Sequence, residues 1–174
     1  MDLKTLTELR APSGHEQPIR RALLAELKEM GLTPSLDRMG NVVVVKPGKG
    51  EHPRRVMVAA HMDEVGVIVS GVTDKGYLEF KTVGGIDTRV IISKKVLVGK
   101  KKIQGVIGMK AVHLLSKTER SDVPKVKSLY IDIGAKDKED AEKSVKLGDI
   151  ISFDTKFCEI GDIIKGKALD RFGV

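Results

Sequence analysis

The first regular pattern of hydrophobic positions lies near the N-terminus and predicts an amphipathic helix over residues 13–30. Ser13 is a suitable N-cap, and Glu16 three residues later completes a capping-box pattern. The apolar residues then recur at spacings of four, four and three, which places one stripe along a helix: Ile19, Leu23, Leu27 and Met30. Gly31 follows the stripe and is suited to the C-cap. We therefore expect this helix to pack on a larger body.

Two short runs of apolar residues follow, at 41–46 and 55–60. Neither run alternates with polar residues, and such runs are typical of strands that are buried on both faces of an α/β sheet. The residues between them are rich in Gly and Pro and predict a loop. One helix followed by two buried strands indicates the beginning of an α/β layer.

After about Val65 the pattern changes to many short β-type segments separated by glycines. The segments are 66–72, 77–83, 95–98, 102–107, 129–133 and 149–153, and one helix is expected at 137–144 with Asp137 as its N-cap. Short strands with frequent turns favour a small barrel or sandwich over a parallel sheet. The predicted fold class is therefore α/β, with residues 1–65 and 162–174 forming part of one α/β domain and residues 66–161 forming an inserted β-rich, barrel-like domain.

Composition limits the function classes without selecting one. The net charge is +7, but aromatic residues are only 3% of the chain and Trp is absent, so platforms for base stacking are scarce. We therefore expect no nucleic-acid partner, although a basic binding protein remains a weak alternative. No apolar run approaches the roughly 18 residues that predict a membrane span. The single cysteine, Cys158, favours a cytoplasmic protein, and its apolar neighbours predict a small core residue.

The candidate chemistry lies directly after the second buried run, in the segment Ala60-His61-Met62-Asp63-Glu64-Val65-Gly66. Active sites of open α/β sheets gather at the carboxyl ends of strands. Residues two apart in an extended chain point the same way, so His61 and Asp63 can share one site. A neutral imidazole is a good ligand for zinc or cobalt, and a neighbouring carboxylate can accept its other N–H. The spacing alone also fits a surface histidine beside a solvated acidic pair.

Several segments of the chain, taken together and in order, resemble one peptidase family. The chain is similar to the metal-dependent family of glutamyl-aminopeptidase and cellulase-M-like proteins, some labelled endoglucanases, whose members form tetrahedral dodecamers. The segments that carry the resemblance are 11–16, 37–41, 60–66, 84–87, 105–108 with 113–115, 130–135 and 167–170. Nothing in the sequence indicates a sugar-cleaving pair of carboxylates.

The resemblance implies roles for three residues. It makes His61 a ligand of one metal ion, Asp63 the catalytic carboxylate that supports this histidine, and Asp170 the ligand that bridges two metal ions. It also implies two divalent ions, zinc or cobalt, peptide substrates that lose their N-terminal residue, and a homo-oligomer built through the β-rich domain. In such a site the ions activate a water molecule, and a glutamate accepts its proton.

The chain departs from the family pattern in two places. The family's general-base glutamate, its neighbouring ligand glutamate and further aspartate and histidine ligands have no counterpart here, and Glu159 and Asp162 precede the bridging position. The family usually carries one more polar residue between the positions of Asp170 and Arg171. His15, His52 and His113 match no ligand position and are expected to be structural or surface residues. We therefore expect a truncated and inactive aminopeptidase chain or, alternatively, a non-catalytic module for self-association.

Overall fold

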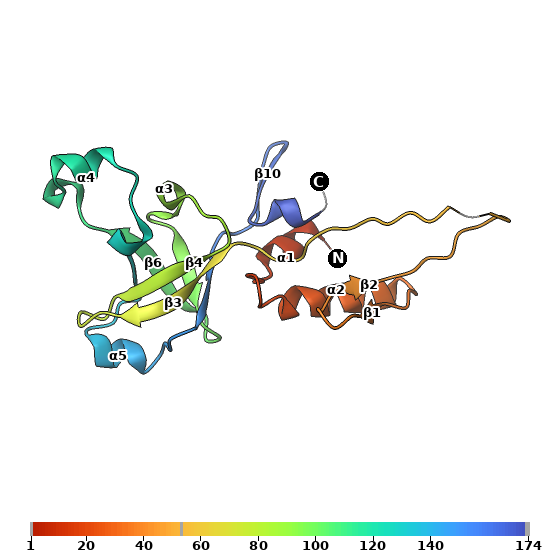
Figure 1. Ribbon diagram of the computed structural model, residues 1–174, viewed down its shortest axis with the longest axis horizontal. Coiled ribbons are helices and arrows are strands. Elements are labelled where there is room, and N and C mark those ends of the chain that lie inside the picture. The colour runs from red at the N-terminus through yellow and green to blue at the C-terminus, as the bar shows by residue number, and fades with distance from the viewer. Residues whose placement is uncertain (1, 53, 173–174) are drawn as a thin grey trace.

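The computed structural model describes residues 2–52 and 54–172. Figure 1 shows an elongated molecule with a β-barrel at one end, two N-terminal helices in the middle and a long extended excursion at the other end. None of the helices in the described ranges is long and apolar enough to cross a membrane. The mixed helix-and-sheet class predicted from the sequence is confirmed, and the β-rich part is a closed barrel.

The barrel has six antiparallel strands in the spatial order β3-β4-β7-β6-β5-β8. Their bounds are Gly66–Val72 (β3), Leu78–Val83 (β4), Lys95–Val98 (β5), Ile103–Met109 (β6), Leu129–Asp132 (β7) and Ile150–Phe153 (β8). Burial alternates along β4, where Leu78 and Phe80 are buried while Glu79 and Lys81 are exposed. Ile107, Ile131 and Ile151 are fully buried in the barrel interior. Burial of each such side chain stabilises the fold by about 1.5–3 kcal/mol.

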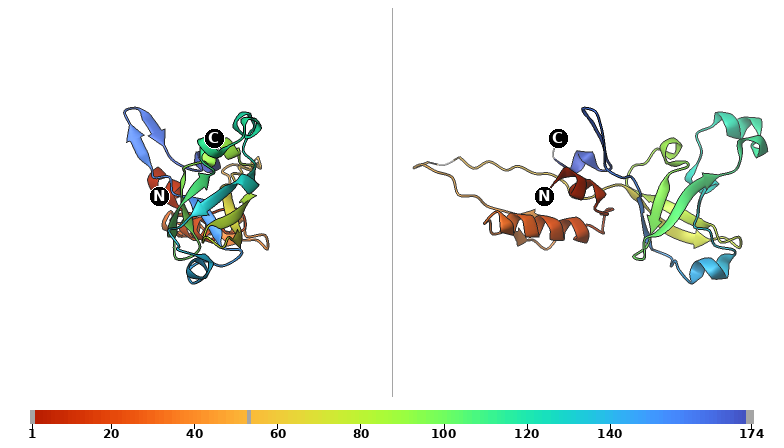
Figure 2. Two further views of the ribbon diagram at one scale, coloured as in Figure 1. Left: turned by 90° about the vertical axis from the view of Figure 1, so that its left-hand side faces the viewer. Right: turned by 180° about the vertical axis from the view of Figure 1, so that it is seen from behind.

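Short helices lie around the barrel and connect its strands (Figures 1 and 2). They are α3 (Thr88–Ile91), η1 (Val112–Leu114), α4 (Lys117–Ser121), η2 (Val126–Ser128) and α5 (Lys138–Glu142). The helix α5 is shorter than expected, but its N-cap is the predicted one, because Asp137 accepts a hydrogen bond from the amide of Asp140 at 2.8 Å.

Two helices form the N-terminal body. The first, α1 (Leu3–Glu8), is capped by Asp2 and has no counterpart among the sequence predictions. The second, α2 (Gln17–Glu29), ends before Gly31, whose φ of 75° fits the predicted glycine cap. The predicted start at Ser13 is wrong. The N-cap is Glu16, which makes no side-chain capping bond, because its carboxylate instead accepts from the amide of Gly14 at 2.5 Å.

The two predicted buried strands are largely absent from the described part of the chain. Of the first run only β2 (Val42–Val43) is a strand, paired with β1 (Ser35–Leu36). Residues 55–60 are extended but unpaired, and Val56, Met57 and Val58 are 82–92% exposed. A strand needs neighbours for its backbone N–H and C=O groups, and no described strand pairs with residues 55–60.

The last elements are a hairpin and a short helix. Strands β9 (Cys158–Ile160) and β10 (Ile163–Lys165) pair with each other and project into solvent (Figures 1 and 2). Cys158 is therefore exposed, and its predicted place in the core is wrong. Its apolar neighbours misled the prediction, because no other element covers this hairpin in the described structure. The chain continues into η3 (Leu169–Phe172), which lies beside α1.

Candidate functional site

The structure brings together the three residues that the sequence singled out. The Nδ1 atom of His61 lies 3.0 Å from Oδ1 of Asp63, and its Nε2 atom lies 3.4 Å from Oδ2 of Asp170. His61 and Asp63 share one side of an extended stretch, as the two-residue spacing predicts. Asp170 approaches from η3, more than a hundred residues later. One imidazole thus lies between two carboxylates.

Asp63 is held by a second partner in addition to His61. The hydroxyl of Ser13 donates a short hydrogen bond to its Oδ2 atom. This bond lowers the pKa of the Asp63 carboxyl below its usual value, partial burial opposes the shift, and the contact with His61 adds to it. Ser13 is therefore part of the candidate site, a role that the predicted helix cap had hidden. An ionised Asp63 can accept the Nδ1–H of His61.

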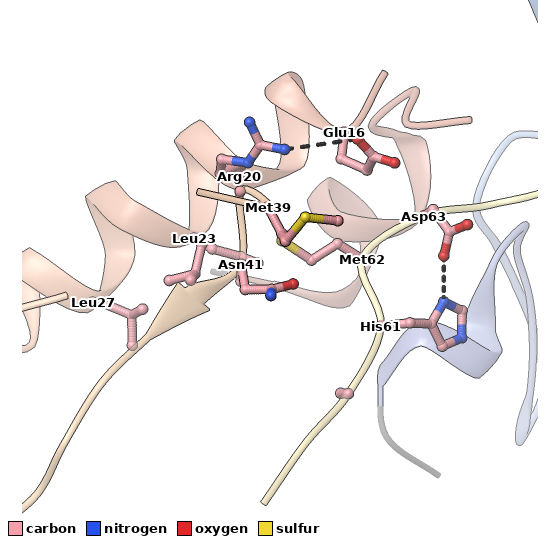
Figure 3. Close-up of a pocket in the computed structure, with 12 residues that line it drawn as sticks. Glu16, Arg20, Leu23, Leu27, Met39, Asn41, His61, Met62 and Asp63 are labelled. Carbon is pink, nitrogen blue, oxygen red and sulfur yellow. Dashed lines mark hydrogen bonds and ion pairs between the residues drawn. The ribbon is translucent and has the colours of Figure 1, made fainter. Parts of the chain in front are cut away.

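A cavity of about 380 Å³ lies on the other side of this stretch, between α2, β2 and residues 60–63. Figure 3 shows the side chain of Met62 directed toward Met39, while His61 and Asp63 point the opposite way. Arg20 of α2 and the N-cap residue Glu16 form an ion pair at 3.7 Å on the cavity wall. His61 and Asp63 are nevertheless among the residues that line this cavity, so the cavity adjoins the polar groups of the site.

Asp170 reaches His61 through an unusual backbone turn. Ala168 has a φ of 51°, a left-handed conformation that costs a residue with a Cβ atom about 1 kcal/mol or more. The side chain of Asp170 remains 76% exposed, compared with 48% for His61 and 39% for Asp63. The site is thus open to solvent on the side where Asp170 and His61 meet.

Glu64, the residue after Asp63, points inward. Its side chain is 5% exposed, and its Oε1 atom accepts a hydrogen bond from the amide of Ala11 at 2.9 Å. Its backbone also pairs with the same segment: the amide of Glu64 donates to Ala11 O at 2.9 Å, and its carbonyl accepts from Ser13. Glu64 therefore joins the His61 stretch to the N-terminal segment.

The buried partner of Glu64 is Lys167. Its Nζ atom lies 2.6 Å from Oε1 and 2.7 Å from Oε2 of Glu64, and it donates to the carbonyl of Leu9 at 2.8 Å. Burial lowers the pKa of the Lys167 ammonium below its ordinary value, and the carboxylate of Glu64 opposes that shift. Because Lys167 comes three residues before Asp170, the ion pair of Lys167 with Glu64 fixes the segment that carries Asp170.

Two arginines extend the buried polar cluster. The guanidinium of Arg171 donates to the carbonyls of Leu6, of Leu9 at 3.3 Å and of Met62 at 3.4 Å. The guanidinium of Arg10 donates to Ser152 Oγ at 2.5 Å, Leu97 O at 2.8 Å and Gly99 O at 3.1 Å of the barrel. The N-terminal segment therefore contacts both the barrel and the end that carries Asp170.

Sequence reasoning missed Ser13, Glu64 and Lys167 as members of this arrangement. The sequence did contain a signal for Glu64. It lies between the apolar Val65 and the candidate site, and a carboxylate that becomes buried there needs a hydrogen-bonding or charged partner. Nothing local identified Lys167 as that partner. His15, His52 and His113 are exposed, which is the surface alternative of the prediction, and Glu159 and Asp162 lie on the exposed hairpin.

The donor set fits one side of a metal site but does not complete it. An imidazole nitrogen and a carboxylate oxygen 3.4 Å apart can bind the same divalent cation, and Asp63 fixes the second ring nitrogen. Structural and catalytic zinc sites use three or four protein ligands. Within the described residues, no group of three or more His, Cys, Asp or Glu side chains is arranged to hold a metal ion.

Comparisons with known proteins show which family the chain resembles. The family model described as M42 glutamyl aminopeptidase matches residues 40–174. The glutamyl aminopeptidase of Lactococcus lactis subsp. cremoris is 36% identical over 180 residues, which cover 98% of this chain and 50% of that protein. The chain thus spans about half the length of the curated relatives it matches.

Solved structures give the same result for the fold. An aminopeptidase from the archaeon Desulfurococcus kamchatkensis superposes with a TM-score of 0.84 at 39% identity, covering 98% of this chain and 47% of that one. The TET1 peptidase of Pyrococcus horikoshii superposes with a TM-score of 0.82 at 38% identity, covering 98% and 52%. That peptidase is described as able to assemble into a tetrahedron or a large octahedral shell.

Proposed function

Because this chain belongs to the M42 glutamyl aminopeptidase family, we propose that it supplies part of a metal-dependent site that releases N-terminal residues from peptides. The observation that carries the proposal is the position of His61, with Asp63 at 3.0 Å from one ring nitrogen and Asp170 at 3.4 Å from the other. This is the arrangement expected of a metal-binding histidine, its supporting carboxylate and a second metal ligand.

The residues of the chain have separate tasks in this proposal. Asp63 accepts the Nδ1–H of His61, which leaves the lone pair of Nε2 free for a metal ion. Ser13 holds Asp63 in place and favours its ionised form. His61 and Asp170 would hold divalent cations, for which we propose zinc or cobalt. When bound, two such ions lower the pKa of a shared water molecule and polarise a substrate carbonyl.

Further groups must complete the site. Hydrolysis needs an acid–base residue within reach of the metal-bound water, and two protein ligands are too few for a pair of ions. We propose that sequence corresponding to the second half of the relatives supplies the general-base glutamate and the remaining ligands. The 174-residue chain alone is then expected to be inactive.

We further propose a division of the molecule and an assembly. Residues 66–161 form an inserted domain that mediates self-association, and residues 1–65 with 162–174 belong to the α/β peptidase domain. The closed barrel and the shell-forming structural neighbours support this proposal. The expected partners are peptides and other copies of the chain, the assembly is a dodecamer by family resemblance, and the single cysteine is compatible with the cytoplasm.

A measurement of metal binding and turnover tests the function. In a polypeptide that also carries the segment matching the second half of the relatives, we expect chelator-sensitive release of an N-terminal residue. His61→Ala should lower kcat at least 100-fold there, and His113→Ala, on the exposed η1 turn, should leave it unchanged. Turnover by the 174-residue chain alone, or full activity of the His61 variant, would contradict the proposal.

The barrel also favours a second candidate, a module for self-association without catalysis. All six strands close on one another and bury a continuous core, so this part can be stable without the rest of the peptidase. Metal binding separates the two candidates, because self-association, which sedimentation measures, is expected of both. Stable oligomers, together with no metal binding in the complete polypeptide, would favour the non-catalytic module.

A further inference from the structure

No sheet fixes the distance between His61 and Asp170 in the described structure. The stretch that leads to His61 pairs with no strand, and β10, which leads toward Asp170, pairs only with β9. Backbone pairing therefore does not align the two segments, which are more than a hundred residues apart. The alignment must come from other contacts.

Those contacts converge on one buried carboxylate. Glu64 accepts from the amide of Ala11 at 2.9 Å and from the ammonium of Lys167 at 2.6 and 2.7 Å. Lys167 in turn donates to the carbonyl of Leu9 at 2.8 Å. Glu64 thus ties together residues 6–13, the His61 stretch and the Asp170 segment. The side chains of Glu64 and Lys167 are 5% and 9% exposed, so water competes little with these bonds.

We infer that Glu64 and Lys167 are positioning residues, which hold Asp170 against His61 through the buried ion pair. The inference rests on the proposed function, because it gives a role to residues beside the proposed metal ligands. Glu64 directly follows Asp63 and points to the opposite side of the extended chain, as alternation requires. Lys167 is bound inward while Asp170, three residues later, is directed outward to His61.

The strained turn between Lys167 and Asp170 agrees with this role. Ala168 adopts a φ of 51°, which residues other than glycine keep only where the surroundings enforce it. The chain is held on both sides of this turn, by Lys167 on Glu64 and by Arg171 on the carbonyls of Leu9 and Met62. These two anchors supply the constraint on the turn between them.

The same arrangement connects the site to the barrel. Arg10 lies next to Ala11, the backbone partner of Glu64, and its guanidinium donates to Ser152, Leu97 and Gly99 of the barrel. The N-terminal segment, residues 6–13, therefore connects the barrel to the site. Movement of this segment would change the separation of His61 and Asp170, because both are bound to it through Glu64.

The test measures the contact between His61 and Asp170 in the apo chain by NMR. Asp170→Asn removes the charge that faces Nε2 of His61, and it should shift the ring Cε1–Hε1 resonance of that residue. In the Lys167→Met background we expect this response to fall at least fivefold. Lys167→Arg, which keeps the charge, should retain most of it. The His61 signal is assigned by its loss in His61→Gln.

Two controls separate positioning from general loss of structure. Lys165→Met removes an exposed lysine of β10 only two residues away and should leave the full response. Ile151→Ala destabilises the barrel core without touching the ion pair, and it should also leave the response intact while the chain remains folded. The amide spectrum of the barrel reports folding in every variant.

If the Lys167→Met substitution disorders residues 6–13, the Glu64→Gln variant is used in its place. The amide side chain of Gln keeps the shape of Glu and the acceptor for the Ala11 amide, but it lacks the charge. A full Asp170→Asn response in the Lys167→Met or Glu64→Gln protein would overturn the inference. So would the absence of a response in the unmodified chain, or an equal loss in Ile151→Ala. The readout requires neither metal nor substrate, so a failed activity assay and a failed positioning test are distinguishable.

Discussion

The ammonium of Lys167 lies 2.6 Å from the carboxylate of Glu64, a partner 103 residues earlier in the chain, and both side chains are almost completely buried. This ion pair joins the segment of His61 to the segment of Asp170. A buried charge is tolerated only with a partner and further hydrogen bonds, and here Leu9 and Ala11 provide those bonds.

Removal of one charge of this pair should be costly. Lys167→Met leaves Glu64 buried without its counter-charge, and we expect a loss of about 3–5 kcal/mol in the free energy of unfolding. Urea denaturation followed by circular dichroism measures the change. Lys165→Met on the exposed strand β10 is the control and should remain within about 0.5 kcal/mol of the parent. Equal stability of the two variants would contradict the burial argument.

The left-handed turn at Ala168 predicts a stabilising substitution. Glycine adopts a positive φ without steric cost, so Ala168→Gly should raise the unfolding free energy by up to about 1 kcal/mol. Ala59→Gly, in the exposed extended stretch, should instead lower it by roughly a few tenths of a kcal/mol, because glycine raises the entropy of the unfolded chain. Thermal denaturation of both variants gives the comparison. A destabilised Ala168→Gly protein would show that the turn is not strained.

Close packing around Gly66, the first residue of β3, predicts a destabilising substitution. A Cβ atom on Gly66 would lie 2.8 Å from the carbonyl oxygen of Ile151 and 3.0 Å from the ring of Pro12. Gly66→Ala should therefore cost about 1–3 kcal/mol. Gly85 has no heavy atom within 4 Å of the same position and provides the matched control. If Gly85→Ala were equally destabilising, the steric explanation would fail.

The cap of α3 predicts a pH effect. Asp87 accepts from the amide and the guanidinium of Arg89, and the guanidinium bond lowers the pKa of this carboxyl from 3.8 to about 2. Because the folded-state pKa is depressed, the stabilising contribution of Asp87 is complete above pH 3.8 and is lost as the pH falls toward 2.

Titration of the Asp87 carboxyl carbon by NMR checks this prediction. Arg89→Met should move the midpoint upward toward 3.8, because the largest cause of the shift is removed. Arg55→Met, an exposed arginine of the extended stretch, should leave the midpoint unchanged. A midpoint near 3.8 in the unmodified protein would refute the effect of the Arg89 bond.

Local pattern predicted the elements that are stabilised by their own neighbours. The short β-type segment 77–83 corresponds to β4, and the stripe from Ile19 to Leu27 identifies α2. The spacing of His61 and Asp63 places them on one side of the chain, and the structure confirms that they are in contact. These features depend on residues close in sequence, so periodicity is sufficient to predict them.

The sequence by itself therefore determined the barrel strands, the helix α2 and the pairing of His61 with Asp63. Only the tertiary structure decided that Ser13 binds Asp63 instead of capping a helix, that residues 55–60 stay unpaired, and that Glu64 is buried against Lys167. The physical reason is the range of the interactions. Periodicity is a property of neighbouring residues, whereas a buried charge or a strand is satisfied by whichever distant segment the fold brings beside it.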